Sequence, residues 1–172
     1  MANLVVKAIF LYEDFWDQAT STLVSLTTVG ELEVVSVQDL VKSINAKIGN
    51  RKMDRLEIFA HGTDTYISAG TDQLHTYTPK KHMPKLKSLQ GKFEEDGMVV
   101  LYVCEAGKCT SVLSEMAKTL GVEIYAATGD VRPMAYATPF VIGGERVVAH
   151  PDGSINSGSQ VENVYYNDGS QD

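Results

Sequence analysis

Short apolar runs alternate with amphipathic segments along most of this chain, and no other feature constrains its fold so strongly. Runs typical of strands occupy residues 4–12, 33–37, 56–60, 98–103 and 122–127. Segments with apolar residues at helical spacing lie between them, at residues 14–28, 39–48, 79–93 and 109–120. This alternation predicts an α/β domain with a mainly parallel sheet and helices on both faces. Because parallel crossovers are right-handed, we expect the carboxyl ends of the strands to meet at one edge of the sheet.

Two segments depart from the alternation. The polar stretch 63–78 predicts a loop or small hairpin that leaves the third strand. Residues 140–149 predict two short strands around a Gly-Gly turn. We expect one domain over residues 1–172, with its core at 4–128 and a β-rich extension at 132–166.

The charge of the chain argues against one class of function. The formal net charge is −7 and the pI is near 5.1, whereas nucleic-acid binding requires clustered positive charge. We therefore expect no nucleic-acid partner. The basic residues do gather in one segment, which we interpret as a solvated helix face; they are Lys80, Lys81, Lys85, Lys87 and Lys92.

The sequence does not predict export or membrane insertion. No segment approaches the ~20 apolar residues that a membrane-spanning helix needs. The first residues lack the basic leader and the small-residue cleavage site of a signal peptide. We expect a cytoplasmic protein without a membrane partner, although export without an N-terminal signal would leave the same pattern.

The chain has two cysteines, Cys104 and Cys109. A disulfide between them is not expected in a reducing compartment. Without a further His or Cys nearby they also make a poor zinc site. We expect Cys109 to be a small buried residue at the start of a helix, and we expect neither a metal nor another cofactor.

Chemically distinctive residues follow two of the predicted strands. The run 56–60 stops at His61, and the run 98–103 stops at Cys104. If both strands are parallel, the imidazole and the thiol lie at the same edge of the sheet, where open α/β sheets keep their sites. A neighbouring His activates a thiol by stabilising the thiolate or by accepting its proton. The positive end of the helix that follows Cys104 would add to this activation. The sequence therefore predicts thiol nucleophilic catalysis.

Two glycines complete this pattern. Gly62 follows His61 directly, so no side chain shields its backbone N–H. Together with the N–H of Cys104, that group could form an oxyanion hole for a tetrahedral intermediate. Gly107 would let the chain turn sharply out of the nucleophile strand.

These residues resemble the caspase-like cysteine peptidases, a group that includes caspases, gingipains, clostripain, separase and CHAT domains. The shared pattern is an apolar strand ending in His-Gly and a later apolar strand ending in Cys, here at residues 58–62 and 101–104. The run Cys-Glu-Ala-Gly at 104–107 is similar to the Cys-Glu-Thr-Gly of many CHAT domains. The resemblance covers residues 54–130. Val103 departs from it, because many members carry a small residue before the cysteine.

The resemblance implies a three-layer sandwich with a mainly parallel, caspase-like sheet flanked by helices. It also implies a cysteine endopeptidase that hydrolyses peptide bonds of a protein or peptide through a Cys–His dyad. Cys104 would be the nucleophile and His61 the general base and acid. The N–H groups of Gly62 and Cys104 would hold the oxyanion, and no metal would take part.

Three charged residues beyond the strand ends are candidates for recognising a substrate side chain. Asp64 and Asp130 would select Arg or Lys before the cleaved bond, whereas Arg132 would select an acidic residue, as a basic pocket does in caspases. Two other functions stay open on the same residues. The chain could be a catalytically inactive binding or regulatory module, or another thiol-dependent acyl hydrolase acting on thioesters or esters. The sequence leaves the oligomeric state open.

Overall fold

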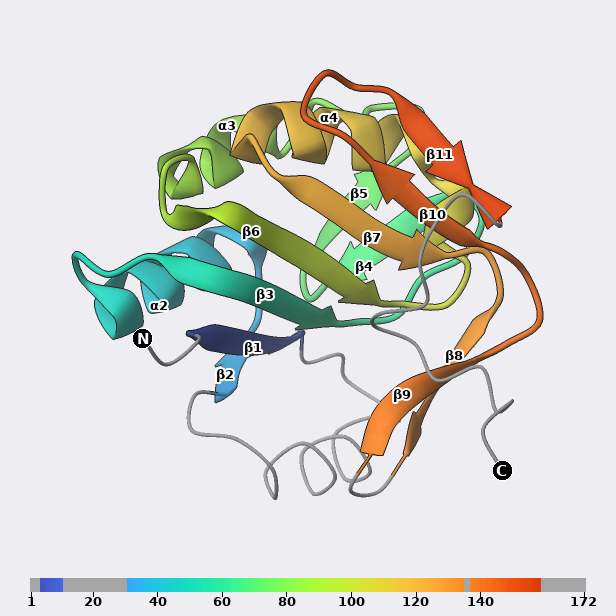
Figure 1. Ribbon diagram of the computed structural model, residues 1–172, viewed down its shortest axis with the longest axis horizontal. Helices are drawn as coiled ribbons and strands as arrows, with labels where there is room; N and C mark the ends of the chain where they lie inside the picture. The colour runs from blue at the N-terminus through green and yellow to red at the C-terminus, as the bar shows by residue number, and fades with distance from the viewer. Residues whose placement is uncertain (1–3, 11–30, 135–136, 159–172) are drawn as a thin grey trace.

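A computed structural model describes residues 4–10, 31–134 and 137–158 of the protein. Its centre is a seven-stranded sheet with the order β11-β10-β7-β6-β3-β1-β2 (Figure 1). The five strands from β7 to β2 are parallel, and β10 and β11 extend the sheet in antiparallel orientation. The predicted α/β class and mainly parallel sheet are thereby confirmed. The strands are β1 (Val5–Phe10), β2 (Glu31–Val34), β3 (Met53–Phe59), β6 (Phe93–Tyr102), β7 (Glu123–Ala127), β10 (Arg146–Ala149) and β11 (Ile155–Ser157).

The helices of the described residues form a row along one face of the sheet (Figure 1). They are α2 (Val37–Ile48), α3 (Met83–Leu86) with the 3-10 turn η1 (Lys87–Leu89), and α4 (Thr110–Leu120). The Ser36 side chain caps α2 by accepting a hydrogen bond of 3.1 Å from the Asp39 N–H. None of these helices has the length and apolar character that crossing a membrane requires.

Both faces of the sheet are apolar and covered. On the helix face, residues such as Leu40, Leu101 and Leu113 form the larger core, each 1% exposed or less. On the other face, a second cluster includes Phe59 and Tyr102, whose rings stack with centroids 4.7 Å apart. Burial on both faces explains the near-continuous apolar runs of the central strands. It also agrees with the three-layer arrangement expected from the sequence.

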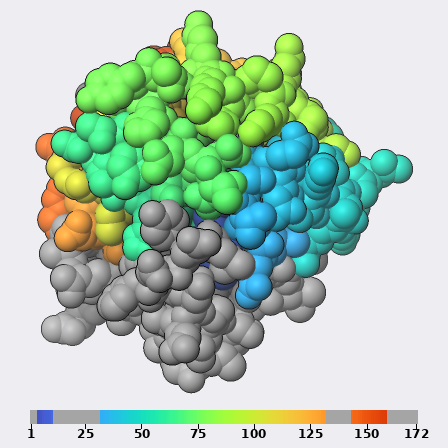
Figure 2. Space-filling view, turned by 180° about the vertical axis from the view of Figure 1, so that it is seen from behind, coloured from blue at the N-terminus to red at the C-terminus, as the bar shows by residue number. Residues whose placement is uncertain are grey.

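Two hairpins lie outside the central sheet. β4 (Tyr66–Ala69) pairs with β5 (Asp72–His75), and β8 (Asp130–Met134) pairs with β9 (Ala137–Ile142). The first confirms the small hairpin predicted after the third strand. Seen from behind, the green segment that contains this hairpin and α3 covers the upper part of the molecule (Figure 2).

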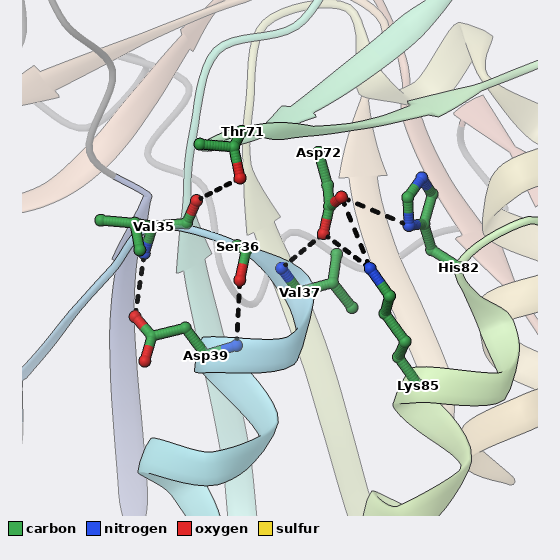
Figure 3. A network of polar contacts seen from close by, with 8 residues as sticks. All are labelled: Val35, Ser36, Val37, Asp39, Thr71, Asp72, His82 and Lys85. Atoms are coloured by element: carbon green, nitrogen blue, oxygen red, sulfur yellow. Dashed lines mark hydrogen bonds and ion pairs between the residues drawn. The ribbon is translucent and has the colours of Figure 1, made fainter.

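A polar cluster around Asp72 fastens the β4–β5 hairpin to two helices (Figure 3). The Asp72 carboxylate accepts a hydrogen bond of 3.1 Å from the Val37 N–H at the start of α2. It also accepts one of 3.2 Å from Lys85 Nζ on α3, and its Oδ1 lies 3.7 Å from Nδ1 of His82. One carboxylate thus holds together the hairpin and the first turns of α2 and α3.

The helix predicted at 79–93 is much shorter than expected. Only α3 and η1 are helical, and β6 already begins at Phe93. Pro84 cannot donate a backbone hydrogen bond, which limits the helix before it. Gly91 then adopts a φ of +80°, which reverses the chain and lets Phe93 pair with Met53. The predicted inner residues are nevertheless buried.

Two further boundaries differ from the sequence prediction. The strand expected at 33–37 ends at Val34, because Ser36 caps a helix that starts at Val37. The helix predicted at 14–28 lies outside the described residues.

The two short strands predicted around Gly143 and Gly144 are present, but they do not pair with each other. β9 pairs with β8, whereas β10 pairs with β7 and joins the central sheet. Both glycines have positive φ, of +67° and +75°. A Cβ on Gly144 would lie 2.3 Å from the Gly129 nitrogen. Gly144 therefore lies where the chain passes so close to Gly129 that no side chain fits, whereas a Cβ on Gly143 would meet nothing within 4 Å.

Candidate active site

His61 and Cys104 follow neighbouring parallel strands in the same register. β3 pairs with β6 so that Phe59 stands opposite Tyr102. The Ala60 N–H continues the ladder by donating to the Tyr102 carbonyl at 3.5 Å. His61 and Cys104 each stand two residues beyond this last pair of the ladder, and both residues are partly exposed. The predicted meeting of the two strand ends at one edge is thus found in the structure.

Gly62 packs directly on the strand end that carries Cys104. A Cβ at Gly62 would lie 2.5 Å from Cγ1 of Val103 and 2.8 Å from the Cys104 carbonyl oxygen. These distances are too short for any side chain, so glycine is required here for close approach rather than for a special φ. The contact also ties the His61 loop to the Cys104 strand independently of the β3–β6 ladder.

The backbone N–H of Gly62 faces away from the β4–β5 hairpin. Gly62 forms an antiparallel bridge with Ile67. The hydrogen bonds around this bridge run from Thr63 N–H to the Tyr66 carbonyl (2.9 Å) and from Ser68 N–H to the His61 carbonyl (2.8 Å). In that pattern the central residue is a non-hydrogen-bonded pair, whose own N–H points to the opposite side. The hairpin therefore leaves the Gly62 N–H unused.

The thiol of Cys104 is half-buried against β8. The Val131 N–H donates to Sγ at 3.4 Å, and Sγ lies 3.5 Å from the Val131 carbonyl oxygen. Burial raises the pKa of the Cys104 thiol, and the charges of Asp130 and Glu105 act in the same direction, whereas the N–H of Val131 opposes them. The resting group at neutral pH is the thiol.

His61 is also neutral at rest. Partial burial lowers the pKa of its imidazole below 6.5, because a cation is disfavoured where water is excluded. A neutral imidazole can accept a proton, which an imidazolium cannot. The site therefore carries a neutral acid and a neutral base, not a preformed thiolate–imidazolium pair.

The backbone directly after Cys104 is strained. Glu105 has a φ of +57° and is the one residue other than glycine with positive φ in the described part of the chain. Its N–H donates to the Gly129 carbonyl at 2.9 Å, which holds this conformation in place. Left-handed non-glycine residues cost about 1–2 kcal/mol and gather at functional sites.

Gly107 lies in the turn that follows Cys104, and there it approaches β7 closely. A Cβ there would lie 2.7 Å from the Ala127 carbonyl carbon and 2.8 Å from the Thr128 nitrogen. Gly107 thus allows the turn after Cys104 to pack against the end of β7. Cys109, two residues further on, is the N-cap of α4, so the helix begins at Thr110, six residues after Cys104, rather than beside the thiol.

The candidate substrate-binding acids surround this edge. Asp64 and Asp130 are both exposed. The pKa of Lys108 is raised first by its hydrogen bond to Glu105 and then by the charges of Glu105, Asp64 and Asp130. The carboxylates of Glu105, Asp64 and Asp130 therefore lie close enough to Lys108, at this edge of the sheet, to interact with its charge. Arg132 lies on β8, opposite Phe140 of β9.

Three contributors to the site were not predicted from the sequence. They are the Val131 backbone at the thiol, the strained Glu105, and the side chain of Cys109. Cys109 is fully buried and its Sγ lies 3.3 Å from the Thr63 carbonyl oxygen, so it holds the loop that follows His61. Burial raises its pKa to about 11. The chain-distant contact of Val131 and the φ of Glu105 leave no signal in a single sequence.

Within residues 4–10, 31–134 and 137–158, no three His, Cys, Asp or Glu side chains converge as a metal site would require. The chemistry available from these residues is that of the thiol, the imidazole and the surrounding backbone N–H groups.

Residues 10–133 match the family described as "Domain of unknown function (DUF4347)". The match covers most of the chain, including His61, Cys104 and Val131, and the chain belongs to this family. A comparison with curated proteins found no match.

Proposed function

We propose that this member of the DUF4347 family is a cysteine endopeptidase that uses Cys104 and His61 as a catalytic dyad. The observation that carries the proposal is the meeting of two strand ends in register, with Gly62 packed on Val103 and Cys104. The strained Glu105 next to the thiol supports it. The resemblance to caspase-like peptidases rests on the same residues.

The first half of the reaction forms an acyl-enzyme. Sγ of Cys104 attacks the carbonyl carbon of the cleaved peptide bond while its proton passes to the neutral ring of His61. The carbonyl oxygen becomes an oxyanion that accepts hydrogen bonds from the N–H groups of Gly62 and Cys104. His61 then returns the proton to the departing amine nitrogen, the C–N bond breaks, and a thioester remains on Cys104.

The second half releases the product. His61 takes a proton from a water molecule as its oxygen attacks the thioester carbonyl, and the same N–H groups hold the second oxyanion. The C–S bond breaks, Sγ regains its proton from His61, and the new carboxyl group leaves. The directions of the two pKa shifts support a proton that moves during attack rather than before substrate binds.

The charges at the rim favour a basic side chain next to the cleaved bond. Asp64, Glu105 and Asp130 outnumber Lys108, and their combined field would attract Arg or Lys. Arg132 offers the opposite choice, an acidic side chain. Internally quenched peptides that differ only in the residue before the cleaved bond separate the two preferences. Selection by the acidic residues predicts cleavage of the Arg and Lys peptides, whereas selection by Arg132 predicts cleavage of the Asp and Glu peptides. Equal cleavage of basic, acidic and apolar members would remove both.

The dyad itself is tested by three alanine variants assayed on that peptide panel. We expect Cys104→Ala and His61→Ala each to lower kcat/KM at least ~10³-fold. Cys109→Ala removes the other thiol and its contact with the Thr63 carbonyl, and should lower kcat/KM far less than either dyad variant. Each variant is checked by circular dichroism and by its Tm, so that loss of fold is not mistaken for loss of chemistry.

Other outcomes assign the alternatives. Full peptidase activity in Cys104→Ala or His61→Ala would discard the dyad. A wild-type protein that cleaves small thioesters but no peptide would be another acyl hydrolase. A folded wild-type protein inactive on both, with Cys104 unreactive toward a peptidyl chloromethyl ketone, would be a binding or regulatory module.

A further inference from the structure

We infer that a lysine-lined groove between α3 and α4 is a docking site for an acidic segment of a partner protein. The groove has a volume of about 570 Å³. α3 and η1 form one wall and the last turns of α4 form the other. The inference is independent of the peptidase proposal.

The charge of this region is opposite to that of the rest of the protein. Residues 76–93 contain five lysines and no acidic residue, in a chain whose formal net charge is −7. Lys80 and Lys87 line one wall of the groove, and Lys118 lines the other. Glu115 is the one acidic residue among those that line it. A compact positive patch on an acidic protein steers a negative partner to one place.

Two of these lysines form no ion pair among the described residues. Lys85, which belongs to the same segment, is held by Asp72, and Lys118 lies 3.3 Å from Glu115. In contrast, Lys80 and Lys87 are exposed and make no ion pair with any residue of the described part of the chain. Lysines placed together without counter-charges repel one another, so an acidic occupant would relieve that repulsion.

The floor of the groove favours a peptide over nucleic acid. Met83 and Pro84 supply apolar surface between the lysines, and Met83 is 6% exposed. A peptide can place apolar side chains on this floor and carboxylates on the lysines. A long polyanion such as nucleic acid would be repelled by the exposed acidic residues at positions 94–96, which directly follow the basic segment in the sequence.

The groove is remote from the candidate active site. α4 starts at Cys109 near the carboxyl edge, and Lys118 lies in its last turn. At about 1.5 Å per residue, these ends are separated by roughly 14 Å. Figure 1 shows α3 beside the end of α4 that lies away from the arrowheads of β3 and β6. A bound segment would therefore leave Cys104 open.

The test measures binding of a fluorescein-labelled peptide of alternating Glu-Glu-Leu repeats to the full chain by fluorescence anisotropy at low salt. We expect binding that weakens as NaCl is added, because exposed charges are screened. The Lys80→Glu/Lys87→Glu variant should weaken binding at least ~10-fold. The matched Lys42→Glu/Lys52→Glu variant changes the net charge equally, at exposed lysines outside the groove, and should weaken it less than ~3-fold.

Each of the other outcomes overturns the inference. Absence of wild-type binding would show that the groove takes no acidic segment. Equal weakening in the two variants would show a general effect of net charge. Tighter binding of a labelled single-stranded oligonucleotide than of the peptide, lost in the same variant, would assign the patch to nucleic acid. A Tm within a few degrees of wild type confirms that each variant is folded.

Discussion

Two polar regions flank the β4–β5 hairpin, and they use their polar groups in opposite ways. At Asp72 a carboxylate accepts hydrogen bonds from Val37 and Lys85 and lies beside His82, so it fastens three elements together. At the carboxyl edge, the Cys104 thiol has long sulfur contacts with the Val131 backbone, and the next residue is strained. In the first arrangement the polar groups stabilise the fold. The second leaves the thiol and the imidazole partly exposed. We interpret this difference as the sign of an active site.

The contrast is sharpest at Gly62, where we expect the largest effect of a single methyl group. Gly62→Ala would force Cβ against the Val103 side chain and the Cys104 carbonyl, which lie 2.5 and 2.8 Å away. Backbone atoms cannot yield as a flexible side chain does, so we expect a loss of about 1–3 kcal/mol in the free energy of unfolding. Displacement of the proposed oxyanion donor should also lower kcat/KM by ~10²-fold or more. Urea unfolding and peptide hydrolysis measure the two effects.

Gly91→Ala is the control for this variant. A Cβ at Gly91 meets nothing within 4 Å, but its φ of +80° disfavours a side chain. It should therefore reduce stability by about 1 kcal/mol without changing activity per folded molecule. Unchanged kcat/KM in Gly62→Ala would break the link between this glycine and the chemistry.

The sequence predicts the part of the site that depends on strand order. Apolar runs ending at His61 and Cys104 are visible in the sequence, and the parallel topology follows from the alternation of elements. Handed crossovers then bring the two ends to one edge, as the structure shows. The same reasoning identified Gly62, and the structure adds a steric reason for a glycine there, its close approach to Val103.

What the sequence does not predict depends on contacts between distant segments or on local backbone geometry. Val131 contacts the thiol because β8, which follows β7 closely in the sequence but belongs to another sheet, begins beside Cys104. The Gly143-Gly144 pair is a hairpin signal in isolation, but tertiary pairing sends its two strands to different sheets. The helix predicted at 79–93 is too long because Phe93 pairs with Met53 in the sheet, and helical periodicity carries no information about such pairing.

The Asp72 cluster should respond in stability and not in chemistry. Asp72→Ala removes the acceptor for the Val37 N–H and the partner of Lys85, and we expect it to reduce the free energy of unfolding by about 1–3 kcal/mol. Asp72→Asn keeps an acceptor oxygen and should lose less. Asp96→Asn, at an exposed position, should stay within about 0.5 kcal/mol of wild type. A large fall in kcat/KM with little change in stability would place Asp72 in the site instead.

The pH dependence of this cluster gives a second readout. Burial alone would raise the pKa of Asp72, but hydrogen bonds from Lys85 and Val37 and the charges of His82 and Lys85 outweigh it and hold the pKa below 3.8. A carboxyl group with a lowered pKa in the folded state stabilises the protein above its unfolded pKa. That contribution disappears as the pH falls through the folded-state value. The stability gap between wild type and Asp72→Asn should therefore be constant near neutral pH and shrink below about pH 4.

Glu105 tests whether the carboxyl edge really stores strain. Glu105→Gly removes the side chain that disfavours a φ of +57°, so we expect the free energy of unfolding to rise by about 1 kcal/mol. The ion pair that is lost, to the exposed side chain of Lys108, contributes little. The added freedom next to Cys104 should lower kcat severalfold, as expected where a site gives up stability for geometry.

Glu105→Ala separates backbone strain from the loss of the carboxylate. Alanine lacks the ion pair with Lys108 but keeps the penalty for a left-handed φ, so this variant should be no more stable than wild type. If both variants gained equally, repulsion among the carboxylates of Glu105, Asp64 and Asp130 would explain the gain, and the backbone would not be strained. If only the glycine variant gains stability while losing turnover, the strain belongs to the chain geometry that presents the thiol. In that case the difference between the two polar regions is one of function, since the fold alone would favour glycine at position 105.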